Sequence, residues 1–91
     1  MIEIIKVREA RALDAHRIWI RFSNGKEGVH DFADMLAEGG MMVEPLRDPA
    51  MFQRVFLEFG TLTWPNGFDL DSIALHDRMA EASELSQVAV E

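Results

Sequence analysis

The clearest pattern of apolar and polar positions in the chain is the strict alternation over residues 16–22. It predicts a strand with three apolar side chains on one face and three side chains of mixed polarity on the other. These are Ile18, Ile20 and Phe22 against Arg17, Trp19 and Arg21. Asn24-Gly25 follows at once and is typical of a two-residue type I′ hairpin loop, because both residue types tolerate positive φ. The returning strand is expected over residues 27–32.

Three further segments predict strands. The β-branched run over residues 2–8 predicts the first strand of the chain. Residues 54–59 and 61–64 predict a second hairpin around Gly60. Its first strand places three apolar side chains on one face, namely Val55, Leu57 and Phe59. Pro65 ends its second strand, because proline cannot donate a ladder hydrogen bond.

Short helices are expected at three places. Asp31 or Asp34 caps a helix over residues 33–38, which Gly39-Gly40 ends. Asp48 followed by Pro49 opens about one helical turn. Residues 69–72 cap a helix that runs from about residue 72 to residue 80 or beyond. Its expected inner stripe is Ile73, Met79 and either Leu75 or His76.

Hairpins without βαβ units indicate the fold class α+β. We expect a small, mainly antiparallel sheet of about five strands with two or three short helices. The 91 residues suffice for one domain, expected over residues 1–80. The polar stretch over residues 81–91 is expected to be a tail that frays, extends the helix or docks on a neighbouring chain.

The formal net charge of -7 is unevenly distributed along the chain. Residues 1–22 carry +2, residues 23–47 carry -3 and residues 48–91 carry -6. An acidic C-terminal half repels phosphate, so we expect no direct binding of nucleic acid and a partner with basic character instead. The absence of cysteine fits a cytoplasmic location, and no apolar run is long enough to cross a membrane.

No catalytic or metal-binding motif is present in the sequence. The three histidines lie far apart, and none has metal-ligand spacing: His16, His30 and His76. Asp69-Leu70-Asp71 lacks the rest of a calcium loop and is better explained by helix capping. Ser72, His76 and Asp77 lack the nucleophile elbow of a hydrolase. We therefore expect no enzymatic activity, no metal and no cofactor.

Two apolar features invite functional interpretations. Trp19 between two arginines is suited to stacking bases or reading an acidic partner, but we favour an outer sheet face on which a helix covers the tryptophan. Four of the six methionines lie between residues 35 and 51. Exposure of Met41 and Met42 would indicate an interface rather than a core filled by methionine.

The order of these segments resembles a small bacterial family, the domain of unknown function numbered 2442. The resemblance covers about residues 1–78. Its most specific parts are Trp-Pro-Asn-Gly-Phe-Asp-Leu at 64–70 and Pro-Leu-Arg-Asp-Pro-Ala-Met-Phe at 45–52. It implies a compact α+β domain, in some members fused to a helix-turn-helix domain for which this chain has no room after residue 80. It also implies that members are encoded beside a second small protein in pairs that look like toxin–antitoxin modules, with this chain as the antitoxin-like or regulatory member.

The sequence therefore favours a non-enzymatic protein-interaction module that binds a small, basic protein. The alternative is a small-molecule-sensing domain with a pocket near Trp64–Gly67. Self-association through an edge strand or the C-terminal helix stays open. The residues expected at the interaction or ligand surface are Trp19, Met41, Met42, Trp64, Asn66, Asp69 and His76.

Overall fold

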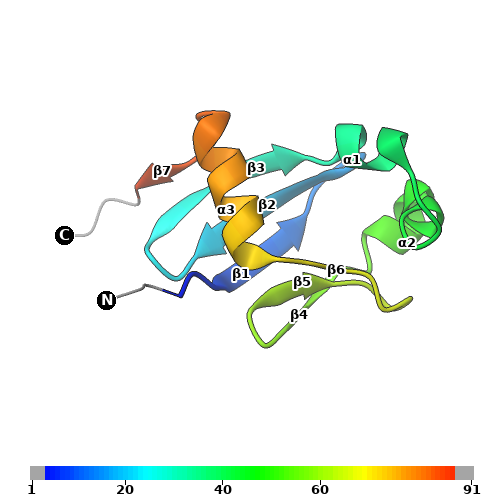
Figure 1. Ribbon diagram of the computed structural model, residues 1–91, viewed down its shortest axis with the longest axis horizontal. Helices are drawn as coiled ribbons and strands as arrows, with labels where there is room; N and C mark the ends of the chain where they lie inside the picture. The colour runs from blue at the N-terminus through cyan, green and yellow to red at the C-terminus, as the bar shows by residue number, and fades with distance from the viewer. Residues whose placement is uncertain (1–3, 88–91) are drawn as a thin grey trace.

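The alternating segment forms the strand β2 (Arg17–Phe22), which lies at the centre of the fold (Figure 1). The structure, a computed structural model, describes residues 4–87. In the first antiparallel sheet the strand order is β1-β2-β3-β7, with β1 (Val7–Ala12), β3 (Lys26–Asp31) and β7 (Ser86–Gln87). In the second the order is β4-β5-β6, with β4 (Phe56–Glu58), β5 (Thr61–Thr63) and β6 (Asp69–Leu70).

The helices of the described chain are α1 (Ala33–Glu38), α2 (Pro49–Phe52) and α3 (Ser72–Glu81), and η1 (Glu44–Arg47) is a short 3₁₀ helix. The α+β class, the antiparallel pairing and the three short α-helices are confirmed. The strands form two small sheets where a single sheet of about five strands was predicted. Within residues 4–87, β5 pairs with β4 and β6 and with no strand of the first sheet, so these three strands form a sheet of their own.

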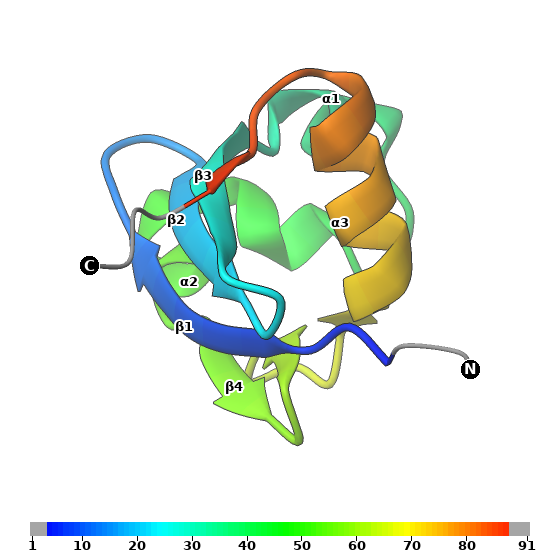
Figure 2. The same ribbon diagram turned by 90° about the vertical axis from the view of Figure 1, so that its left-hand side faces the viewer.

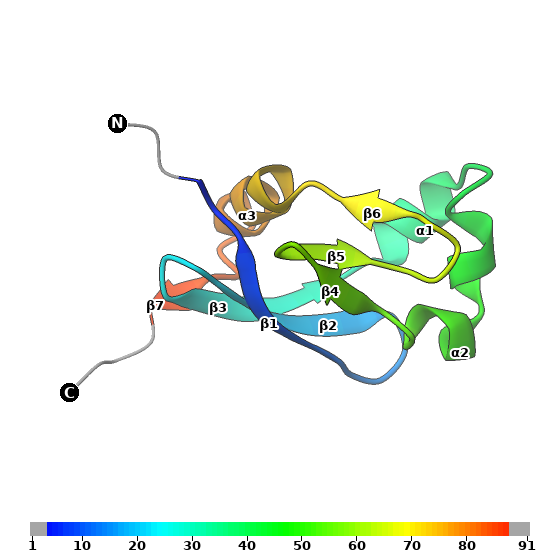
Figure 3. The same ribbon diagram turned by 90° about the horizontal axis from the view of Figure 1, so that it is seen from below.

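The core lies between the first sheet, helix α3 and the second sheet, as Figure 2 shows. The predicted inner face of β2 is confirmed, since Ile18, Ile20 and Phe22 are at most 1% exposed. Helix α3 adds Leu75 and Met79 to this core. Helices α1 and α2 gather with η1 at one end of the molecule (Figure 3). No helix of residues 4–87 lies on the opposite face of the first sheet (Figure 2).

The two-residue turn predicted for the first hairpin is found in the second hairpin instead. The loop between β2 and β3 has three residues, 23–25, and only Gly25 has positive φ. The predicted two-residue type I′ loop at Asn24-Gly25 is therefore wrong. Instead, Phe59 and Gly60 form the two-residue turn between β4 and β5, and both have positive φ (53° and 77°).

The first strand begins later than predicted. It covers Val7–Ala12 rather than residues 2–8, of which residues 2 and 3 lie outside the described part of the chain. The turn over residues 13–16 explains the shift, because Leu13 N donates to Arg17 O at 2.8 Å and brings the residues just before it into register. Ala12 consequently pairs with Ile18, and Val7 with Phe22.

The second hairpin is shorter and more exposed than predicted. β4 covers only three residues, and Phe59, predicted to share a face with Val55 and Leu57, is 87% exposed in the turn. Its side chain points away from the core because the chain reverses direction there.

Helix α3 has a different inner stripe from the predicted one. Leu75 and Met79 are buried as expected, but Ile73 is 43% exposed and Ser72 takes the inner position. The Ser72 hydroxyl donates to Gly60 O at 2.7 Å, which fixes the rotation of the helix against the second hairpin. The capping prediction is confirmed for Asp71, whose side chain accepts from Ala74 N.

The chain after α3 turns back onto the first sheet. Ser83 has positive φ (59°), and Ser86 and Gln87 pair with Glu27 and Lys26 of β3. Up to residue 87 the segment adds a fourth strand to the first sheet, whereas fraying and extension of the helix were two of the three expected alternatives; docking on a neighbouring chain stays a prediction. The other predicted caps hold in part: Asp48 caps α2, while Asp31 accepts from the first amide of α1.

Candidate functional site

The seven residues expected at a functional surface occupy three separate regions. Trp19 lies on the open face of the first sheet, and His76 lies on α3. The remaining five lie on two segments at one end of the molecule, which a hydrogen bond joins. They are Met41, Met42, Trp64, Asn66 and Asp69.

The loop after α1 presents two exposed methionines. Met41 is 88% exposed and Met42 is 44% exposed. The Asn66 amide Nδ2 donates to Met42 O at 2.9 Å, and Asn66 Oδ1 accepts from Phe68 N. Asn66 therefore holds the methionine loop against the turn after β5, and the apolar side chains are presented on a positioned backbone.

Trp64 belongs to the core beneath this loop. It has no exposed surface, and its indole Nε1 donates to Phe52 O at 2.8 Å. Its ring packs between Phe52 and Phe68, with centroid separations of 5.6 and 5.7 Å. The tryptophan thus cannot line an open pocket. Asp69, by contrast, is exposed on β6 and pairs with Thr63.

A concave pocket of about 210 Å³ does exist between α1, β6 and α3. Five of its nine lining residues are apolar, and the other four are polar or charged. The lining residues are His30, Phe32, Met35, Glu38, Leu70, Asp71, Ala74, Leu75 and Arg78. An adjoining pocket of about 330 Å³ shares His30 and Arg78 with it and is otherwise lined mainly by acidic residues.

His30 stands between the two pockets and is held by Glu84. The imidazole Nδ1 lies 2.7 Å from the Glu84 carboxylate, which accepts the hydrogen bond, and the His30 side chain is 12% exposed. Sequence reasoning found neither this pair nor the pocket. The register explains the omission: His30 pairs with Ile18 and shares its inward face only with the observed three-residue loop, whereas the predicted two-residue loop would place Asp31 opposite Ile18.

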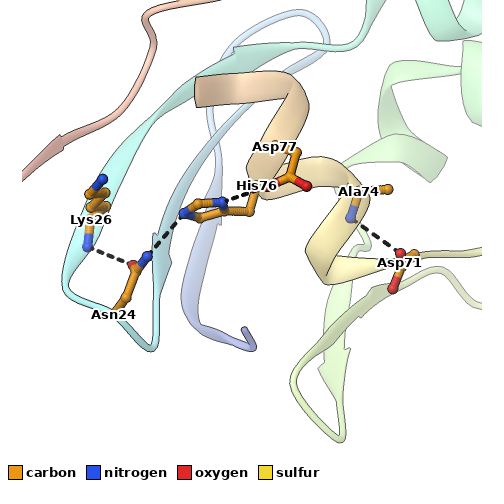
Figure 4. Close-up of polar contacts among 6 residues, drawn as sticks. All are labelled: Asn24, Lys26, Asp71, Ala74, His76 and Asp77. Atoms are coloured by element: carbon orange, nitrogen blue, oxygen red, sulfur yellow. Dashed lines mark hydrogen bonds and ion pairs between the residues drawn. The ribbon is translucent and has the colours of Figure 1, made fainter. Parts of the chain in front are cut away.

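His76 connects α3 to the hairpin loop of the first sheet (Figure 4). Its Nε2 accepts from Asn24 Nδ2 at 3.0 Å, and its Nδ1 donates to the Asp77 carboxylate at 3.2 Å. The ring meets Phe22 edge-on at 5.0 Å. Lys26 N donates to Asn24 Oδ1, so the Asn24 Nδ2 group faces His76. His76 Nε2 must therefore accept, and the ring proton lies on Nδ1. This arrangement is a structural clamp with both ring nitrogens engaged.

Replacing His76 with alanine should lower the free energy of unfolding by about 1–2 kcal/mol, because the half-buried Asn24 amide loses its acceptor and Phe22 loses an aromatic contact. Asp77→Ala is the matched control, since its exposed carboxylate should change stability by less than about 0.5 kcal/mol. Urea denaturation monitored by circular dichroism measures both. Equal effects of the two substitutions would contradict a clamp at His76.

Trp19 is half-buried on the open face of the first sheet, and the expected helix cover is absent. The helices pack on the opposite face, where Ile18 and Ile20 make the core. The Arg11 guanidinium instead lies 5.8 Å from the Trp19 ring centroid, and its amino group also pairs with Glu9. This face is dominated by paired charges.

The other arginines of this face are paired as well. Arg21 lies 2.8 Å from Glu9. Arg17 hydrogen-bonds the Asp14 carboxylate and thereby holds the pKa of that carboxyl below its ordinary value. With its cations neutralised locally, the face offers little net attraction for phosphate.

Within residues 4–87, no group of three or more histidines and carboxylates is placed to hold a metal ion. None of the helices in this part of the chain is long and apolar enough to cross a membrane.

Comparison with known proteins gives a family but no characterised relative. No curated protein matches the chain, and no solved structure matches it. The model of one family, described as "Protein of unknown function (DUF2442)", matches residues 7–81. That match covers every helix of the described chain and every strand except β7. The chain belongs to the DUF2442 family.

Proposed function

We propose that this protein is a cytoplasmic, non-enzymatic interaction module that binds a small basic protein and acts as an antitoxin-like or regulatory partner. The observation that carries the proposal is the pair of exposed methionines, Met41 and Met42, on a loop held by Asn66. The removal of an apolar methionine side chain from water by a partner stabilises the complex.

The chemistry of methionine supports a protein ligand. Its unbranched, polarisable side chain adapts to differently shaped apolar surfaces, and it recurs at binding surfaces for that reason. A loop that served only as a connection would gain nothing from two adjacent apolar side chains in solvent. The Asn66 bond limits the freedom of the backbone, so less conformational entropy is lost on binding.

The charge of the chain supports a basic partner. Every segment after residue 22 is net acidic, and acidic side chains flank the methionine loop at Glu38 and Glu44. Both carboxylates are on exposed residues. Complementary charge accelerates encounter and selects against acidic competitors.

Co-expression of the tagged chain with the product of the adjacent gene tests this function. We expect the two proteins to co-purify as a complex, and any activity of the partner to fall when this chain is present. Two proteins that elute separately, with the activity of the partner unchanged, would contradict the proposal.

Met41→Asp should weaken the complex about tenfold or more, which corresponds to about 1.4 kcal/mol, while leaving stability unchanged because the side chain is already in water. Phe59→Asp is the matched control: Phe59 is 87% exposed, against 88% for Met41, and lies on the β4–β5 turn. Isothermal titration calorimetry gives both affinities. A complex that loses affinity only with Phe59→Asp would place the interface elsewhere.

A small-molecule-sensing role is the second candidate, and the pocket between α1, β6 and α3 is the observation in its favour. This pocket lies away from the predicted position near Trp64–Gly67, since the Trp64 side chain is packed in the core. Thermal shift across a metabolite panel separates the candidates: a ligand that stabilises the isolated chain favours sensing, and a uniformly flat panel favours the interaction module.

A further inference from the structure

The pocket between α1, β6 and α3 combines an apolar floor with an acidic surround. Phe32 and Leu75 are buried at its base, and Met35 and Leu70 are half-buried around it. Such a floor favours an apolar group, because the removal of apolar surface from water stabilises the bound state.

The charges around this pocket and the adjoining one are strongly unequal. Five carboxylates line the two pockets: Asp31, Asp34, Glu38, Asp71 and Glu84. Arg78 is the one lysine or arginine among the residues that line them. The remaining titratable group, His30, is engaged with Glu84. Pockets lined by an excess of carboxylates attract cations.

The size of the apolar pocket is suited to one side chain. Its volume of about 210 Å³ lies below the range of roughly 300–1,000 Å³ that is usual for drug-sized ligands. A single large apolar side chain needs less room than a whole metabolite, and its backbone would remain outside among the carboxylates. The dimensions therefore suit a side chain that a polypeptide inserts.

Two segments of the chain lead from the pocket to the methionine loop. Helix α1 contributes Met35 and Glu38 to the pocket and leads directly into Met41 and Met42. β6 contributes Leu70, and the chain just before β6 contains Asn66, which bonds Met42 O. One bound segment can reach both surfaces.

We propose that this pocket receives one apolar side chain of a basic polypeptide segment, whose flanking lysines or arginines pair with Glu38, Asp71 and Asp34. This inference rests on the proposed function, because the segment belongs to the same partner protein. Beyond that function, the inference names the residue of the partner that anchors it in the pocket: an aliphatic side chain flanked by cationic ones.

A peptide titration tests the anchor without the partner. The probe is the capped peptide acetyl-Lys-Lys-Leu-Lys-Lys-amide, followed in ¹H–¹⁵N spectra of the whole chain. Two reference peptides replace the leucine with serine or the lysines with glutamates. We expect shifts at Met35, Ala74 and Leu75 for the leucine–lysine peptide, with at least about tenfold weaker binding of both references.

Variants make the test specific to the pocket. Ala74→Trp fills it from the exposed side of α3, and Glu38→Lys reverses one flanking charge; each should weaken the peptide at least about fivefold. The matched controls Ala80→Trp and Glu58→Lys make the same changes on α3 and β4 and should bind like the unaltered chain. Binding that is equal for all three peptides, or unchanged in Ala74→Trp, would overturn the inference.

The outcome is separable from that of the proposed function. A complex with the adjacent gene product that is insensitive to Ala74→Trp overturns the anchor and leaves the interaction module standing. Peptide binding at the pocket with no complex overturns the choice of partner and supports the anchor chemistry.

Discussion

Replacing Trp64 with alanine is expected to lower the free energy of unfolding by about 3–5 kcal/mol. The side chain is fully buried, packs between Phe52 and Phe68, and donates its indole N–H to Phe52 O. Its removal leaves a cavity and takes the shorter of two hydrogen bonds from Phe52 O, which then keeps only the bond from Val55 N at 3.3 Å. The free energy of unfolding of a small domain is roughly 5–15 kcal/mol in total, so this one substitution removes a large part of the stability.

Trp64→Phe and Trp19→Ala are the controls for this prediction. The phenylalanine keeps an aromatic ring but loses the hydrogen bond, so its effect should be smaller than that of alanine. Trp19 is half-buried on the open sheet face, and its removal should cost less than about 1.5 kcal/mol. Urea denaturation at a fixed temperature compares all three. A loss below 1.5 kcal/mol for Trp64→Ala, by this same rough scale, would contradict a core role and reopen the pocket expected there.

Gly28→Ala is expected to displace the C-terminal strand and lower stability by about 1–3 kcal/mol. A Cβ on Gly28 would lie 1.9 Å from Glu84 O, and the contacted atom is backbone, which cannot rotate away. Residues 84–87 would have to leave β3, and with them the Glu84 carboxylate that holds His30. Hydrogen exchange should then show lost protection where β3 and β7 pair, while β1 and β2 stay protected.

A chain that ends at Ser83 provides the control for Gly28→Ala. Without Glu84 the clash is gone, and alanine should then be neutral or stabilising in the strand by about 0.5–1 kcal/mol. If Gly28→Ala destabilises the shortened chain as much as the full one, the close approach of Glu84 does not explain the glycine.

The elements with strong local patterns were predictable from sequence. The alternation of β2 fixed both the strand and its buried face, and Asp48 and Asp71 marked the starts of α2 and α3 as capping residues do. In each case neighbouring residues alone determine the outcome. The α+β class followed from these elements and their spacing.

The features that depend on distant contacts were not predictable. The apolar run over residues 2–8 has strand propensity, but the turn at residues 13–16 selects residues 7–12 as the partner of β2. Ile73 would suit an inner helix face, yet the Ser72 bond to Gly60, twelve residues away, turns it outward. Sequence patterns do not record such tertiary restraints.

The same limit applies to the candidate site. Exposure of Met41 and Met42 matched the condition stated for an interface, and Asn66 joined them through an unforeseen bond. The pocket was missed because its walls come from α1, β3, β6 and α3, which only the fold brings together. Conversely, Trp64 is predicted at a ligand surface and lies in the core, because a tryptophan in a turn-rich motif suits a pocket wall and a core anchor equally well.

Hydrogen exchange of the chain with and without the adjacent gene product tests the interaction module most directly. We predict a complex in which exchange slows over residues 33–42 and 66–78, the segments that carry the methionine loop and the pocket. No slowing anywhere at saturating concentrations of that product, or slowing confined to β1 and β2 around Trp19, would contradict it.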